Sequence, residues 1–163
     1  MTVHFEIVEI SDHQREMVAQ FWMAHWGGTT MVSRGKLYEA REFPGFFAME
    51  GDDIVGLVTY RVEVDECEVM SLDSLKAGAC IGSALMAVVK EKAIAMNCRR
   101  LWLITTNDNM NAMRFYQKRG FVLVAVHRNA LEESRKLKPE IPMVGFDGIP
   151  LRDEIELEMM LEA

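Results

Sequence analysis

The apolar residues between positions 46 and 104 change their spacing twice along the chain, and this change constrains the fold more than any other feature. Two apolar runs, at 46–49 and 54–60, flank the turn sequence Gly51-Asp52-Asp53 and predict an antiparallel hairpin. The alternating residues 64–72 predict a third strand that pairs with the hairpin. The first half of this region therefore predicts an antiparallel sheet.

The second half of the region changes to a helical period and then returns to a strand. From 81 to 96 the apolar residues form one helical stripe, which predicts a helix packed on the sheet. Residues 101–104 are an unbroken apolar run, typical of a strand that is buried on both faces and parallel to its neighbour. A helix over 109–119 is predicted to end at Gly120. This order of elements predicts an α/β (α+β) sandwich with a mixed, mostly antiparallel sheet.

The flanking segments continue the same pattern without a linker or an internal repeat, so we expect a single domain over residues 1–163. The segment 29–42 is polar and is predicted as a loop or a short helix, and the segment 127–152 is a candidate flap. Glu154, Glu156 and Glu158 alternate with apolar residues, which predicts a strand with one solvated face. The other predicted elements are a strand at 5–9, a helix at 11–26, a strand at 121–126 and a helix at 131–137.

The charge and the cysteines limit the partners and the compartment. The formal net charge of −7 disfavours binding to a phosphate backbone and favours a cationic, amine-bearing partner. Cys67, Cys80 and Cys98 are odd in number and contain no C-x-x-C pair, so we expect neither a disulfide framework nor a cysteine zinc site. The charged N-terminus and the short apolar runs predict no export signal and no membrane span. We therefore expect a cytoplasmic protein that binds neither nucleic acid nor membrane.

Common catalytic motifs are absent from the sequence. It contains no H-E-x-x-H, no G-x-S-x-G, no Walker sequence and no G-x-G-x-x-G dinucleotide sequence. What remains is a run of small residues from Ala77 to Ser83, between a predicted strand and a long predicted helix. The first turn of a helix has free N–H groups and a partial positive charge, so this run can hold a pyrophosphate through its main chain. Tight helix packing is the alternative explanation for the same small residues.

Four segments that follow one another in the chain resemble the GNAT superfamily of acyl-CoA-dependent N-acetyltransferases. They are Ile54-Val55-Gly56, Met70-Ser71-Leu72, the helix start Ile81-Gly82-Ser83-Ala84-Leu85, and the run 109–116 that leads to Gly120-Phe121. The resemblance covers most of the region from Phe46 to Phe121, and the tail resembles that of uncharacterised bacterial members. It implies a GNAT-type sheet of about seven strands with helices on both faces. It also implies acetyl-CoA as co-substrate, with no metal.

The resemblance further implies where acetyl-CoA binds. The pyrophosphate loop of the family usually reads Gln/Arg-x-x-Gly-x-Gly/Ala, and this chain has Ala77, Cys80 and Gly82 at the three fixed positions. Two of these positions depart from the family, but the main-chain N–H donors are retained. The pantetheine arm is expected to pair with the third strand like an added β-strand, with Asn109 opposite. The implied cofactor-binding residues are Met70, Ser71, Leu72, Ala77, Gly78, Ala79, Cys80, Ile81, Gly82, Ser83 and Asn109.

The implied reaction needs a base for the amine and an acid for the leaving thiolate. An amine is mostly ammonium at neutral pH and attacks a thioester only after it loses a proton. Glu66 and Glu68 are the candidates for that base or for holding the ammonium, and the alternatives are solvated surface carboxylates and a water chain. Alternation along the strand places both on one face with Met70 and Leu72. Tyr116 stands where the family often has its general acid, and core packing is its alternative role.

We therefore expect an N-acetyltransferase that transfers an acetyl group from acetyl-CoA to a primary amine by direct attack. The sequence leaves the acceptor open, whether a small molecule or a protein. The alternative is a catalytically silent sensor that binds acyl-CoA, suggested by Ala77 and Cys80, and a third alternative is an interaction domain without a ligand. The resemblance also suggests a homodimer.

Overall fold

The computed structural model describes residues 4–162. The chain divides into two compact units. The first holds the N-terminal part up to Thr29, Ala40–Leu101 and the end of the chain from Leu161, and the second holds Thr30–Glu39 and Trp102–Met160. Seven strands belong to a mainly antiparallel sheet, which confirms the predicted α/β class. None of the helices in the described part of the chain is long and apolar enough to cross a membrane.

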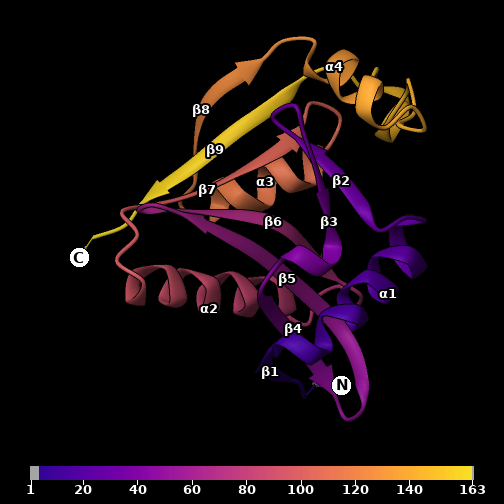
Figure 1. The fold of residues 1–163 in the computed structure, drawn as a ribbon. Coiled ribbons are helices and arrows are strands. Elements are labelled where there is room, and N and C mark those ends of the chain that lie inside the picture. The colour runs from indigo at the N-terminus through magenta and orange to yellow at the C-terminus, as the bar shows by residue number, and fades with distance from the viewer. Residues whose placement is uncertain (1–3, 163) are drawn as a thin grey trace. The chain divides into compact units, whose positions relative to one another are not determined.

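The first unit contains four strands of the sheet and two helices (Figure 1). They are β1 (Glu6–Glu9), a 3₁₀ turn (Asp12–Gln14), α1 (Arg15–Trp26), a second 3₁₀ turn (Ala40–Glu42), β4 (Gly45–Glu50), β5 (Asp53–Glu63), β6 (Glu66–Ser74) and α2 (Ile81–Ala95). The strands lie in the order β1-β4-β5-β6, each antiparallel to its neighbour. The predicted hairpin is confirmed, because Glu50 pairs with Asp53 and Gly51 between them has a φ of 60°.

Helices cover both faces of the sheet in this unit. On one face α2 packs so closely on β5 that a Cβ at Gly56 would lie 2.6 Å from Ile81 Cγ2, so only glycine fits there. Leu57, the next residue, points to the other face. Asp73 pairs with Leu57 across the ladder, and Trp26 of α1 contacts it from that second face. Thus α1 and α2 lie on opposite faces of these strands.

A bulge interrupts the ladder between β5 and β6. Ser71 pairs with Thr59, whereas Val69 pairs with Tyr60. Met70 is therefore an extra residue in β6, with no counterpart in β5. Because side chains alternate along a strand, one extra residue changes which of them share a face on its two sides.

The bulge overturns the predicted grouping of side chains along this strand. Glu66 and Glu68 do not share a face with Met70 and Leu72. They share the face toward α1 with Ser71 and Asp73 instead, because Ser71 and Asp73 lie beyond the extra residue. A single irregular residue thus places four polar side chains in one row.

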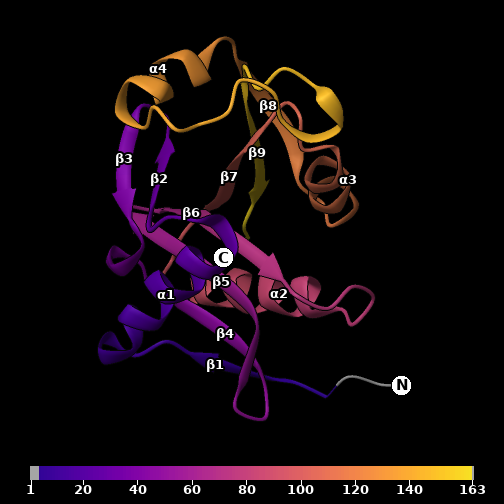
Figure 2. The same cartoon turned by 90° about the vertical axis from the view of Figure 1, so that its right-hand side faces the viewer.

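The second unit contains the remaining strands and helices. They are β2 (Thr30–Ser33), β3 (Lys36–Glu39), β7 (Arg100–Thr106) from Trp102 onward, α3 (Met110–Lys118), β8 (Val122–His127), α4 (Ala130–Leu137), a 3₁₀ turn (Phe146–Gly148) and β9 (Glu154–Met160). Its strands of the sheet lie in the order β7-β9-β8, and α4 lies beside β2 and β3 (Figure 2). Buried and half-buried residues alternate along β7, which differs from the predicted burial on both faces.

The prediction of a loop or short helix over 29–42 is wrong for most of its length. β2 and β3 form an antiparallel hairpin in this segment. Arg34 and Gly35 connect the strands with φ values of 49° and 75°, the left-handed pair that a two-residue hairpin turn requires. Each strand has only four residues, and its two apolar residues are adjacent, so the sequence shows no alternation that would mark a strand.

The glutamates of β9 do not form a solvated face, in contrast to the prediction. Glu154 is buried and accepts hydrogen bonds from the backbone N–H of Arg34 at 3.2 Å and from its guanidinium at 3.0 Å. The carboxylate of Glu156 lies 3.0 Å from a ring nitrogen of His127. These carboxylates therefore connect β9 to neighbouring elements of the second unit.

Candidate active site

A row of four polar side chains lies along the α1 side of β6, and we call this row the polar face of β6. Its members are Glu66, Glu68, Ser71 and Asp73. Charged and polar residues are seldom buried unless they are paired or used in function. Glu68 and Ser71 are nevertheless only 3% and 6% exposed. The polar face of β6 is therefore the first candidate site.

The two predicted carboxylates of this row both have arginine partners. Arg61 on β5 donates from Nε to Glu68 at 2.9 Å, and it donates from Nη1 to Glu63 at 2.8 Å. Glu66 is more exposed, and its carboxylate lies 3.7 Å from the guanidinium of Arg100. A buried carboxylate beside a guanidinium is held in its ionised form and in one orientation. The structure thus places both predicted carboxylates together, with Glu68 the more firmly held.

The hydroxyl of Ser71 forms a buried pair with the hydroxyl of Thr59, at 2.6 Å between the two oxygens. Either oxygen can be the donor, so the pair can hold a proton on either side. Met70 at the bulge is buried, and Leu72 is half-buried on the opposite face of the strand. The three predicted pantetheine-binding residues therefore lie in and directly after the irregular part of β6.

Asp73, at the end of the row, was not predicted as a site residue. Its Oδ1 accepts a hydrogen bond from Trp26 Nε1 at 3.1 Å. Its Oδ2 is buried and has no hydrogen-bond partner within the described residues. Burial raises the pKa of Asp73, and the Trp26 hydrogen bond and the charge of His25 offset only part of this increase. Asp73 is thus a half-buried carboxylate whose Oδ2 is buried and lacks a donor.

The loop after β6 contains the predicted pyrophosphate-binding residues. Gly78 and Cys80 have φ values of 75° and 60°, so the main chain turns sharply before α2. Cys80 is the N-cap residue of α2 and makes no side-chain capping bond, and no atom lies within 4 Å of the position of a Cβ at Gly78. An anion thus fits at the exposed N-terminus of this helix. The side chain of Ile81 is in the core, so only its main chain can contribute.

In the second unit, Asn109 caps α3. Its Oδ1 accepts a hydrogen bond from the N–H of Ala112 at 3.1 Å. Asp108 beside it is buried and accepts from the N–H of Phe146 at 3.0 Å, while a Cβ at Gly145 would overlap Asp108 Oδ2. This close approach holds the loop before Phe146 against the start of α3, so Asn109 lies in a small cavity lined by both segments.

Tyr116 lies on α3 and is half-buried. Its ring makes edge contacts with Phe115, at 5.3 Å between centroids, and with Phe121, at 5.6 Å. These contacts fix the ring, which both the catalytic and the packing interpretation of this residue require. Within residues 4–162, no three His, Cys, Asp or Glu side chains are grouped so that they could hold a metal ion.

The residues of this candidate site lie in a part of the chain that matches a known protein family. Residues 9–121 match the acetyltransferase (GNAT) family, and this match covers more than half of the chain. The chain belongs to the acetyltransferase (GNAT) family. Both the polar face of β6 and the loop before α2 lie inside the matched residues.

The relatives of this GNAT chain support its fold. An uncharacterised protein, YdhI of Bacillus subtilis strain 168, is 42% identical over 157 residues, which cover 96% of this chain and 98% of that protein. A solved IAA acetyltransferase of Bacillus cereus ATCC 14579 has a TM-score of 0.72 at 18% identity, with 97% of this chain and 100% of that chain covered. A GNAT family acetyltransferase of Elizabethkingia anophelis with acetyl-CoA bound has a TM-score of 0.69 at 17% identity, with 96% and 98% covered. At these identities the two solved structures show the fold alone.

The sequence missed Asp73 and Trp26 because no local pattern connects them. Trp26 lies 47 residues before Asp73, and only the packing of α1 on the sheet of this GNAT chain brings them together. Two signals were present, since Asp73 follows directly on the predicted segment Met70-Ser71-Leu72, and Trp26 directly precedes Gly27-Gly28. Neither signal was specific without the register of β6.

Proposed function

We propose that this protein is an N-acetyltransferase that transfers an acetyl group from acetyl-CoA to a primary amine by direct attack. Membership in the acetyltransferase (GNAT) family supports the reaction type. The observation that carries the proposal is the buried polar face of β6, followed directly by an exposed, anion-compatible helix start at α2. A related fold from Elizabethkingia anophelis was solved with acetyl-CoA bound, and one from Bacillus subtilis was solved in complex with CoA.

In this proposal the donor is held mainly by main-chain groups. Acetyl-CoA supplies the acetyl group as a thioester, which an unprotonated amine can attack. The N–H groups at the start of α2, from Cys80 to Ser83, bind the pyrophosphate, and the main chain at Met70–Leu72 pairs with the pantetheine arm. Asn109, at the start of α3, is the proposed cofactor-binding residue of the second unit. Because Ala77 has no long side chain, the main chain supplies most of the binding.

The proton steps are assigned to the side chains that the sequence singled out. Glu68, hydrogen-bonded to Arg61, accepts a proton from the ammonium of the acceptor, and Glu66 is the second candidate for this role. The hydroxyl pair of Ser71 and Thr59 lies next along the same face and can pass a proton. Tyr116 donates a proton to the leaving thiolate through its phenol hydroxyl.

A turnover assay tests this function. Purified protein is mixed with acetyl-CoA and a panel of primary amines, and the release of free CoA thiol is followed together with the mass of the acetylated amine. Tyr116→Phe is expected to lower kcat roughly 100-fold, because general acid catalysis typically contributes that much or more. Tyr60→Phe is the matched control: it removes a phenol hydroxyl on the α2 side of the sheet and is expected to retain activity.

The carboxylates are tested in the same assay. Glu68→Gln is expected to lower kcat more than Glu66→Gln, since Glu68 is the buried and firmly held member of the pair. Tyr116→Phe with unchanged kcat at every pH would overturn the assignment of the acid. Binding of acetyl-CoA without turnover of any amine would instead favour the silent acyl-CoA sensor.

A further inference from the structure

Two buried polar atoms near the end of α1 have no hydrogen-bond partner within the described residues. They are Oδ2 of Asp73 and Nε1 of Trp22. Trp22 is fully buried, and its ring stacks on Trp26 at 4.6 Å between centroids. Trp26 in turn donates its indole N–H to the other oxygen of Asp73. Buried polar atoms are nearly always paired in folded proteins, so an unpaired carboxylate oxygen beside this tryptophan pair requires an explanation.

Asp73 differs from the other carboxylates of the polar face of β6. Glu66 and Glu68 each have a guanidinium partner, whereas Asp73 has no arginine or lysine partner in the part of the chain that the structure describes. Among the described residues its hydrogen-bond donor is the neutral indole of Trp26, and the charge of His25 acts on it without a hydrogen bond. A buried carboxylate in this position gains most from a cation with N–H donors, because such a cation supplies both charge and a hydrogen bond.

The surroundings of Asp73 favour an ammonium that carries an apolar group. Trp26 is 43% exposed and Met23, one turn earlier on α1, is 53% exposed, so an apolar rim lies at the surface. Indole faces attract ammonium ions through cation–π interaction. Trp26 is also the last residue of α1, and Gly27 follows in the left-handed conformation with a φ of 80°. The indole therefore stands at the exposed end of the helix.

We propose that Asp73 and Trp26 form a seat for a protonated primary amine, an alkyl- or arylalkylammonium ion. The inference rests on the proposed function, for which this seat binds the acceptor. The ammonium donates a hydrogen bond to Oδ2 of Asp73, and the indole of Trp26 covers it. The seat lies on the same face of β6 as Glu68, and the hydroxyl pair of Ser71 and Thr59 stands between the two carboxylates in that row.

Tryptophan fluorescence measures this binding without acetyl-CoA. The Trp102→Phe variant removes the tryptophan of the second unit and leaves Trp22 and Trp26 as the emitters. Increasing concentrations of phenethylamine at pH 7 are expected to change the emission of these tryptophans until the change reaches a plateau. The uncharged analogue 2-phenylethanol has nearly the same shape and is expected to bind roughly 10- to 100-fold more weakly, which is the usual effect of losing one charged hydrogen bond.

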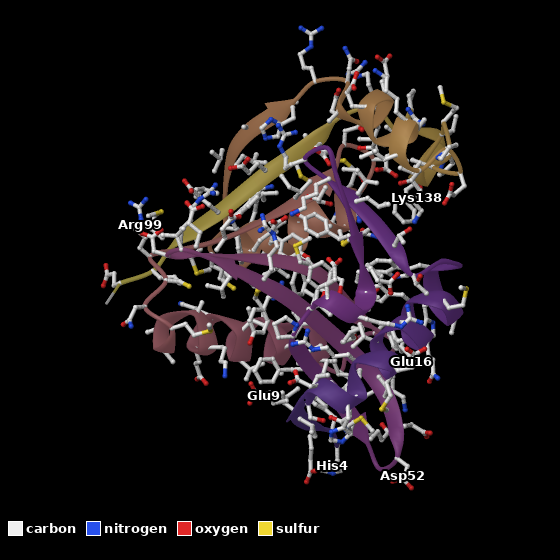
Figure 3. The ribbon with its side chains drawn as sticks, in the orientation of Figure 1. His4, Glu9, Glu16, Asp52, Arg99 and Lys138 are labelled. Atoms are coloured by element: carbon white, nitrogen blue, oxygen red, sulfur yellow. The ribbon has the colours of Figure 1, made fainter. Side chains whose placement is uncertain are left out.

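Two variants in the Trp102→Phe background separate the seat from a general surface effect. Asp73→Asn is expected to weaken phenethylamine binding by a similar factor. Asp52→Asn, at the exposed tip of the turn between β4 and β5 (Figure 3), removes the same charge elsewhere and is expected to change nothing. Circular dichroism verifies folding, and Asp73→Glu replaces Asp73→Asn if that variant does not fold, with weakened binding expected because the carboxylate is displaced by one methylene group.

The outcomes distinguish the seat from the proposed function. Equal binding of the amine and the alcohol, equal binding by Asp73→Asn, or no saturable emission change with phenethylamine would each overturn the seat. Amine binding that depends on Asp73, without release of CoA thiol in the turnover assay, would leave the seat in place and overturn the proposed function. Turnover by Asp73→Asn with an unchanged KM for the amine would overturn the seat and leave the proposed function in place.

Discussion

The half-buried carboxylate of Asp73 affects stability as well as binding. Its raised pKa means that the folded protein holds the proton of this group more tightly than the unfolded chain does. Ionisation of Asp73 therefore destabilises the folded state. The penalty is absent below the ordinary pKa of an aspartate, and it grows as the pH rises through the raised value. His25 and Trp26 face the carboxylate and reduce the penalty without removing it.

Asp73→Asn is accordingly expected to raise the free energy of unfolding at pH 7 by about 1 kcal/mol, the usual size of a single-substitution effect. Urea unfolding at several pH values measures it. The gain should disappear below about pH 3, where the wild-type carboxyl is protonated in both states, and level off at high pH. A variant that is less stable than the wild type at pH 7 would contradict this prediction. A stability gain combined with lost amine binding is the pattern of a residue kept for function.

At the scale of single elements, the hairpin of β5 and β6 contains a strained turn. Val64 connects the two strands with a φ of 57° and is 92% exposed. β-branched residues rarely adopt this left-handed conformation, which costs roughly 1–2 kcal/mol for most residues. Asparagine tolerates it, and this chain uses Asn97 and Asn129 at φ values of 62° and 60°. The turn that sets the register of β6 is therefore less stable than it could be.

Val64→Asn is expected to raise the free energy of unfolding by about 1 kcal/mol, because it relieves this strain and removes no buried contact. Chemical denaturation measures the change. Val122→Asn is the matched control, since Val122 is also exposed but lies in the extended strand β8, where asparagine is disfavoured. An equal gain in both variants would show that the loss of an exposed valine, and not the turn, is responsible.

The same elements show why the sequence predicted some features and missed others. The hairpin of β4 and β5 was predictable because Gly51-Asp52 lies between two strong apolar runs, and α2 was predictable from its helical stripe. The polar face of β6 was not predictable, because the extra residue Met70 reverses the alternation and nothing local marks it. The seat at Asp73 depends further on the packing of α1, which lies far away in the sequence.

At the scale of the whole molecule, the three cysteines differ in exposure, so chemical labelling of their thiols reports both global unfolding and ligand binding. Cys67 is 1% exposed, and burial raises the pKa of its thiol to about 12, while Cys98 is also buried. Cys80 is exposed in the loop before α2. Only a thiolate reacts rapidly with maleimides, so the buried thiols should be labelled only when the protein unfolds. Cys80 should be labelled in the folded protein, next to the proposed pyrophosphate site.

Acetyl-CoA is therefore expected to have two effects that come from one binding event. At about 100 times its Kd, a ligand that binds only the folded state adds roughly 2.7 kcal/mol to the free energy of unfolding, so the melting temperature rises. The same ligand should slow labelling of Cys80 by N-ethylmaleimide, measured by mass spectrometry, and acetyl-CoA itself has no free thiol to consume the reagent. Cys80→Ser is the control, because it should retain the melting shift and show no fast labelling.

The combination of the two readouts locates the ligand. A melting shift without protection of Cys80 would place acetyl-CoA away from the loop that precedes α2, because a pyrophosphate on these N–H groups covers the thiol at the N-cap. Protection of Cys80 together with slower labelling of Cys67 and Cys98 is the expected result, since those two thiols report global unfolding and the ligand stabilises the whole fold. No change in either readout would contradict both the enzyme and the acyl-CoA sensor, because both require the same bound donor.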